Sequence, residues 1–128
     1  MALQEAMRAR LIADDAVKAA LGGAYVYDEA PRGAPPSYVE FTGLDTRDWS
    51  TFGEGGFEHF VSLVVRSNSR GRAQAQAISA AVEAALDGAP LTLAGHRLVN
   101  LRLMFWSVVK TGQNYGASLR FRAATEPL

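Results

Sequence analysis

The chain has 128 residues, of which 48% are hydrophobic and 20% are charged, and its formal net charge at pH 7 is zero. This length suits one domain with one hydrophobic core, and the composition is globular rather than disordered, fibrous or membrane-spanning. Because the chain has no cysteine, disulfides and thiolate metal sites are excluded. Bulk charge gives no sign of nucleic-acid binding, although a local group of arginines could still face phosphates.

The N-terminus does not have the pattern of a targeting segment. Glu5 lies among the first residues, and no basic stretch precedes a long apolar run. No apolar run approaches the roughly 20 residues of a transmembrane helix. We therefore expect a soluble protein that stays where it is made.

Residues 2–21 have apolar side chains at helical spacing, and the glycine pair 22–23 is a stop signal. The acidic pair Asp14-Asp15 leaves an alternative open, in which Asp14 or Asp15 caps a second short helix and divides the segment in two. Residues 24–27 favour a short strand. The proline-rich residues 31–36 favour an extended loop, because proline lacks the backbone donor.

The middle of the chain has the pattern of a long hairpin. Residues 37–48 predict a bent strand broken at Gly43, residues 53–56 predict a turn-forming tip, and residues 57–66 alternate as a second strand. Residues 70–86 then carry the clearest helical spacing. We expect the hairpin to project from the domain.

The last third of the chain predicts strands at residues 91–93, 97–109 and 117–124, which would form a closing antiparallel meander. Residues 1–128 therefore predict one α+β domain, with an antiparallel or mixed sheet and two helices packed on one face. Within residues 101–106, simple alternation places Leu101, Leu103 and Phe105 on one face and Arg102, Met104 and Trp106 on the other. Both faces are then largely apolar, so we expect something to cover the second face.

The residues that could carry chemistry form no recognised site. His59 and His96 lack metal-ligand spacing, and His59 alternates with strand residues as a packed or interfacial histidine does. The serines lack a nucleophile elbow, and the glycine-rich tip has no lysine and opens no helix. We therefore expect no catalytic residues, no metal and no cofactor.

Two groups of side chains could instead serve binding. Arg66, Arg70 and Arg72 surround the start of the second predicted helix, and Arg120 and Arg122 share one strand face, so either group could face phosphates or simply be solvated. The aromatic residues Trp49, Phe52 and Phe57 flank the hairpin tip, where they could anchor an interface or fill the core.

An ordered set of short segments runs along almost the whole chain. It comprises Ala2-Leu3-Gln4, Val26-Tyr27-Asp28, Ala30-Pro31-Arg32-Gly33-Ala34-Pro35, Tyr38-Val39, Asp45-Thr46-Arg47-Asp48-Trp49-Ser50, Gly71-Arg72-Ala73, Leu86-Asp87-Gly88-Ala89-Pro90-Leu91, Gly95-His96-Arg97-Leu98-Val99 and Leu119-Arg120-Phe121-Arg122-Ala123. Taken together, the set resembles the tail-terminator (tail-completion) family of long-tailed phages and gene transfer agents. The apolar run of residues 104–109 departs from that family.

The resemblance implies a virion structural protein rather than an enzyme. Members are expected to form a ring, usually a hexamer, that caps the head-proximal end of the tail tube, stops its polymerisation and joins the head connector or stopper. The expected partners are further copies of the chain, the tail-tube protein, the connector protein and DNA that passes through the lumen without sequence readout. Assembly would take place in the bacterial cytoplasm, followed by residence in the tail of the particle.

A closed ring needs one patch to meet a different patch on the neighbouring copy. We expect exposed strand edges to pair or pack there and to bury Phe105 and Trp106, while the hairpin contacts the tail tube. The expected subunit or ring contacts are Arg47, Asp48, Trp49, Phe52, Phe57, Phe105 and Trp106, and the expected lumen residues are Arg120 and Arg122.

Three other interpretations stay open at this point. The chain could be another ring protein of the head–tail connector, or a cytosolic small-ligand-binding or regulatory domain whose sheet folds over an apolar pocket instead of a neighbouring copy. An enzyme would require Asp45, Arg47, Asp48 and His59 to converge in one cleft.

Overall fold

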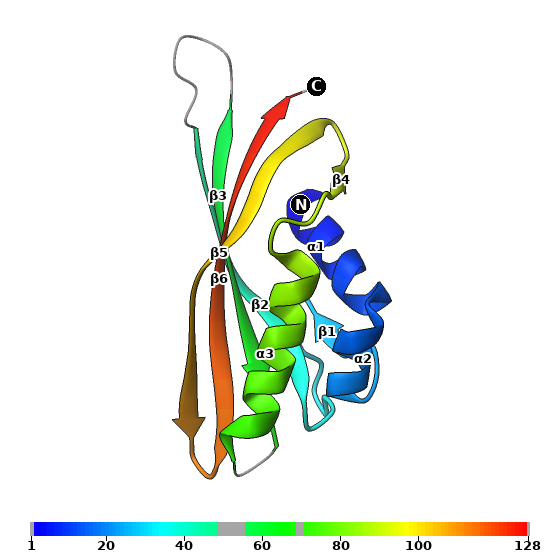
Figure 1. Cartoon of the computed structure of the whole chain (residues 1–128), viewed down its shortest axis with the longest axis vertical. Coiled ribbons are helices and arrows are strands. Elements are labelled where there is room, and N and C mark those ends of the chain that lie inside the picture. The colour runs from blue at the N-terminus through cyan, green and yellow to red at the C-terminus, as the bar shows by residue number, and fades with distance from the viewer. Residues whose placement is uncertain (1, 49–55, 69–70, 128) are drawn as a thin grey trace.

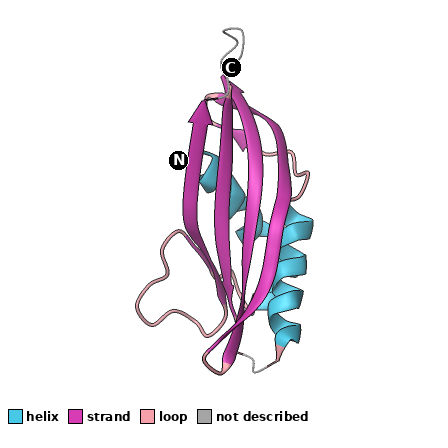
Figure 2. Cartoon of the chain, turned by 90° about the vertical axis from the view of Figure 1, so that its left-hand side faces the viewer, coloured by secondary structure: helices cyan, strands magenta, loops and turns pink. Residues whose placement is uncertain are grey.

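The computed structural model describes residues 2–48, 56–68 and 71–127. In this part of the chain a six-stranded sheet carries its helices on one face only, as Figure 1 and Figure 2 show, and the opposite face is open. The predicted α+β class is confirmed. No helix in these residues is long and apolar enough to span a membrane.

The elements follow one another as α1 (Ala2–Ala13), α2 (Asp15–Leu21), β1 (Val26–Tyr27), β2 (Tyr38–Asp48), β3 (Phe57–Arg66), α3 (Arg72–Leu86), β4 (Thr92–Leu93), β5 (His96–Thr111) and β6 (Asn114–Pro127). The strand order is β1-β2-β3-β6-β5-β4. Strand β1 runs parallel to β2 and the other neighbours pair antiparallel, so the sheet is mixed. The last strand of the chain, β6, lies inside the sheet next to β3, and β5 and β4 follow it toward the edge.

The core lies between the helices and the covered face of the sheet. Helix α1 contributes Leu3, Met7 and Leu11, and α3 contributes Ile78, Val82 and Leu86 on a matching face. The sheet side is formed by alternate residues of the central strands: Val61, Leu63 and Val65 on β3 and Leu119, Phe121 and Ala123 on β6. This period of two sends the intervening side chains to the open face.

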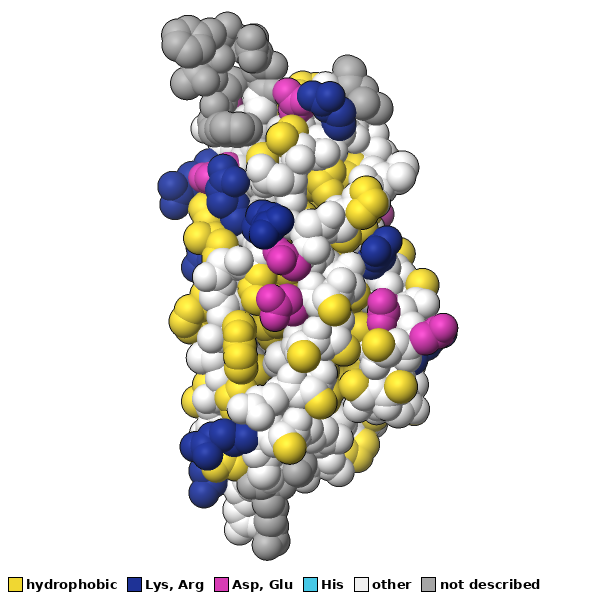
Figure 3. Space-filling model, in the orientation of Figure 1, with side chains coloured by type: hydrophobic (Ala, Val, Ile, Leu, Met, Phe, Trp, Pro, Cys, Tyr) yellow, Lys and Arg dark blue, Asp and Glu magenta, His cyan; other side chains and the backbone are white. Residues whose placement is uncertain are grey.

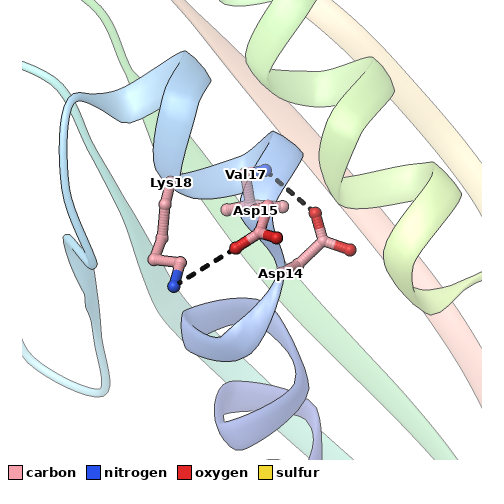
Figure 4. Close-up of polar contacts among 4 residues, drawn as sticks. All are labelled: Asp14, Asp15, Val17 and Lys18. Carbon is pink, nitrogen blue, oxygen red and sulfur yellow. Dashed lines mark hydrogen bonds and ion pairs between the residues drawn. The ribbon is translucent and has the colours of Figure 1, made fainter.

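The N-terminal helical segment is divided at Asp14. Its backbone is extended (φ −83°, ψ 122°), and its carboxylate accepts a hydrogen bond from the amide of Val17 at 2.9 Å (Figure 4). That bond satisfies one of the amides that a helix start leaves without an intrahelical partner. The divided alternative is therefore confirmed, and the described chain has three helices rather than two.

A bulge in β5 changes the faces that simple alternation predicts. Leu103 pairs with Phe121 and Phe105 pairs with Arg120, so Met104 is an extra residue. Phe105 consequently lies on the open face, while Trp106, opposite Leu119, lies on the helix side. The prediction that Phe105 shares a face with Leu101 and Leu103 is wrong, because a single inserted residue reverses the alternation beyond it.

The cap at Asp14 gives a test of the divided helix. Asp14→Ala should lower the free energy of unfolding by about 1 kcal/mol, because the Val17 amide loses its acceptor. Chemical denaturation measures this loss. Asp15→Ala is the matched control, since the Asp15 carboxylate is fully exposed and pairs only with Lys18 at 3.5 Å. Equal losses in the two variants would show that the capping bond does not stabilise the junction.

Candidate functional site

Large hydrophobic side chains are exposed along a single strand. Among the described residues, those with the greatest exposure are Val99 (47%), Met104 (53%), Phe105 (55%), Trp106 (45%) and Val109 (49%), all on β5. Met104, Phe105, Trp106 and Val109 lie within six consecutive residues and form an apolar strip, while Val99 stands apart from them. Exposed apolar strips are typical of contact surfaces. Phe105 and Trp106 were predicted contact residues. Met104 and Val109 were not among the expected contact residues, although the sequence analysis noted the apolar run 104–109.

The outer edge of β5 is covered over only part of its length. β4 pairs with its first two residues, His96 and Arg97. The turn after α3 covers the next part, where the amide of Gly88 donates to the Leu101 carbonyl at 2.7 Å and the amide of Leu103 donates to the Asp87 carboxylate at 2.8 Å. From Met104 onward, no other strand of the described chain pairs with this edge. The apolar strip therefore coincides with an open sheet edge, which ordinarily needs protection.

The open face carries a basic group centred on an aromatic ring. The guanidinium groups of Arg47 and Arg120 lie 5.3 and 4.9 Å from the centre of the Phe60 ring. Such cation–π contacts orient both cations without neutralising them. Figure 3 shows Lys and Arg side chains gathered on the left-hand side, toward which this face is turned in Figure 1.

The two predicted lumen arginines differ in their surroundings. Arg120 is exposed, whereas Arg122 is half-buried and its Nε donates to the Glu58 carboxylate at 2.6 Å. The Phe60 ring and the Glu58 carboxylate were not identified from the sequence, because their pairing depends on the β3–β6 register. Arg120 is thus the more available of the two charges.

The residues predicted as contacts around the hairpin base and at the start of α3 lie in different surroundings. Arg47 and Asp48 are exposed at the end of β2, while Phe57 is half-buried beside the His59 and His96 rings, at 6.3 and 6.1 Å between centres. Trp49, Phe52 and Arg70 lie outside the described residues. Arg66 is exposed, and Arg72 lies over the Tyr115 ring at 5.0 Å.

His59 is a buried core residue rather than a metal ligand. Its side chain is 3% exposed, with Nδ1 hydrogen-bonded to the Thr46 hydroxyl at 2.9 Å and Nε2 to the Thr125 hydroxyl at 2.8 Å. Burial, followed by the charge of nearby His96, lowers the pKa of His59 below its usual 6.5. The prediction of a packed histidine is confirmed.

The described residues around His59 and His96 enclose little space and no group of metal ligands. A cavity of about 140 Å³ lies beside the two histidines, smaller than typical ligand pockets of ~300–1,000 Å³. No group of three potential metal-ligating side chains occurs in residues 2–48, 56–68 and 71–127.

The buried histidine predicts a pH dependence of stability. The unfolded chain protonates His59 at its usual pKa, but the folded chain does so only at lower pH, so stability is full above about pH 6.5 and falls as pH drops from there through the folded pKa. Urea denaturation between pH 5 and 8 measures this slope. His59→Gln retains a hydrogen-bonding side chain without a titrating group and should show a flatter profile. An unchanged slope in the variant would assign the dependence to other groups.

Comparison with known proteins identifies the family of the chain. The family model of tail completion protein gp17 matches residues 5–126. Among solved structures, a chain in the virion of a native gene transfer agent (GTA) particle is similar with a TM-score of 0.88 and 36% sequence identity, over 98% of this chain and 95% of that one. No curated protein gives a significant match.

The family match spans nearly the whole chain, and the similar virion chain is related in sequence as well as in fold. The family consists of structural tail proteins, which confirms the expectation that the chain is not an enzyme. On these grounds the chain belongs to the tail completion protein gp17 family, as the ordered segments of its sequence predicted.

Proposed function

We propose that the chain is a ring-forming tail terminator, which caps the head-proximal end of a tail tube, stops its polymerisation and joins it to the head connector or stopper. The observation that carries the proposal is the exposed apolar strip on β5 in a protein of a tail-completion family. One copy leaves two large aromatic side chains half exposed at an open sheet edge. A permanent neighbour in an assembly would bury them.

The position of the exposed apolar side chains supports a ring. All the markedly exposed large apolar side chains of the described chain lie at one edge of the sheet. A contact between this edge and a different patch of the next copy is heterologous, and such contacts generate either closed rings or open filaments. Capping requires the closed form, and the usual hexamer of similar proteins sets our expected copy number.

The basic open face suits the wall of a lumen. Arg120 and Arg47 keep their charges while stacked on Phe60, and Arg122 is largely neutralised by Glu58. Fixed guanidinium groups attract phosphates of any sequence, so DNA could pass without base readout. We assign Arg120 to this surface with Arg47 beside it.

The hairpin is proposed to contact the tail tube. Arg47 and Asp48 are exposed where β2 ends, while Phe57 packs inward at the start of β3. The described base of the hairpin is therefore anchored on the sheet through Phe57, and the charged side chains of Arg47 and Asp48 lie at its surface.

Replacing Phe105 and Trp106 should weaken assembly and leave the fold of the single chain intact. Phe105→Ser combined with Trp106→Ser should weaken self-association by about a thousandfold, because buried aromatic anchors contribute about 2 kcal/mol each and every ~1.4 kcal/mol is a factor of ten. Sedimentation velocity measures association, and circular dichroism checks the fold. Val99→Ser is the matched control, with similar exposure on the same strand but nearer its other end. Loss of association in the control alone would place the contact elsewhere.

Deleting residues 53–56 should preserve the fold and abolish docking onto tail tubes. The assay is polymerisation of the tail-tube protein with and without the chain, with tube lengths measured by electron microscopy. We expect the intact chain to restrict tube length and the shortened chain to leave tubes uncapped. If the shortened chain caps tubes normally, the hairpin does not contact the tube.

A further inference from the structure

The β5 apolar strip is defined as Met104, Phe105, Trp106 and Val109. A second surface, whose chemistry is complementary to that of the strip, lies at the opposite edge of the sheet. That surface is the proline loop, residues 28–37, between β1 and β2. In Figure 2 this loop projects on the left of the lower part of the sheet, while β5 lies on the right in the upper part and its lower end curves toward the centre. Resting on the ring proposed above, we propose that the β5 apolar strip of each copy packs against the proline loop of the next copy.

The register of the strands places the two surfaces at the same level. Tyr38, which follows the loop, pairs with Arg66, and Arg66 pairs with Gly116. Gly116 pairs in turn with Val109 of β5. A second row joins Phe41 through Leu63 and Leu119 to Trp106.

Equal level matters because rotation about a ring axis moves each surface without changing its height along that axis. Copies set side by side with their strands near the axis direction therefore bring these two edges together. Most of the open β2 edge, residues 44–48, is level with residues 98–103 of β5, where β4 and the turn after α3 already cover part of the strand. Packing of the β5 apolar strip against the proline loop of the next copy therefore agrees with the strand register better than pairing of β5 with β2 of that copy does.

The chemistry of the two surfaces is complementary. Proline-rich segments have little conformational entropy to lose and bind well to aromatic surfaces. The loop holds Pro31, Pro35 and Pro36, and the strip presents Phe105 and Trp106. Beside the loop, a hollow of about 230 Å³ is lined by Pro36, Tyr38, Arg66, Ser67, Asn114, Tyr115 and Gly116, and it offers space for an incoming apolar side chain.

The loop is held in place before any partner binds. The amide of Ala30 donates to the Glu40 carboxylate at 2.6 Å, and the amide of Ala34 donates to the Pro31 carbonyl at 3.1 Å. Gly33 permits the latter turn with a positive φ of 79°. A preorganised loop reduces the entropy that association costs.

The charges favour a contact between unlike edges. Strand β5 has three basic residues and no acidic one, whereas residues 28–40 have three acidic residues and one arginine. A twofold contact of β5 with β5 would instead bring Arg102 and Lys110 of both copies together, and like charges disfavour such an arrangement. The second copy therefore presents its loop edge rather than its own β5.

Cysteine cross-linking tests this contact cleanly because the chain has no native thiol. The double variant Pro36→Cys/Val109→Cys is treated with a short bis-maleimide, in the presence of tail tubes, and examined on a denaturing gel. We expect a ladder of covalent oligomers that ends at the copy number of the ring. Each single variant should remain monomeric on the gel.

The control pair is Pro36→Cys/Val99→Cys. Val99 is as exposed as Val109, but the two lie ten positions apart on β5, a separation of roughly 33 Å, so no ladder is expected. Rings without a ladder in the test pair would overturn this contact and leave the ring proposal standing. Dimers of the single Val109→Cys variant would show a β5–β5 contact and also overturn it. Absence of rings from the wild-type chain would contradict the ring itself.

Discussion

The helices of this protein cover only one face of a six-stranded sheet, and the remaining surfaces follow from that constraint. Alternate residues of β3 and β6 enter the core, so their neighbours must face outward. On most of the open face these neighbours are polar, charged or stacked, as with Phe60 between Arg47 and Arg120. β5 departs from this pattern, because its second half remains both apolar and exposed.

The bulge at Met104 is the local cause of that departure. It directs Phe105 to the open face and Trp106 to the helix side, where each is about half exposed. Two aromatic side chains therefore flank one open edge. For an isolated chain this is an aggregation hazard, and in a closed assembly the same surface becomes a specific contact.

The sequence predicts where helices and strands form better than it predicts which face of the sheet each side chain occupies. The spacing of Leu3, Met7 and Leu11 and the glycine-rich tip identified a helix and a hairpin, because local periodicity determines such features. The bulge at Met104, the β3–β6 pairing and the Glu58–Arg122 ion pair depend on contacts distant in sequence, so local patterns could not reveal them. The sequence accordingly placed Phe105, an expected contact residue, on the wrong face of the sheet.

The central claim is that copies of the chain close into a ring through β5. Light scattering of the purified protein over a wide concentration range, with electron microscopy of any large species, tests it most directly. The account predicts a discrete closed species of about six copies. A monomer at every concentration, with no ring at the ends of added tail tubes, would contradict it.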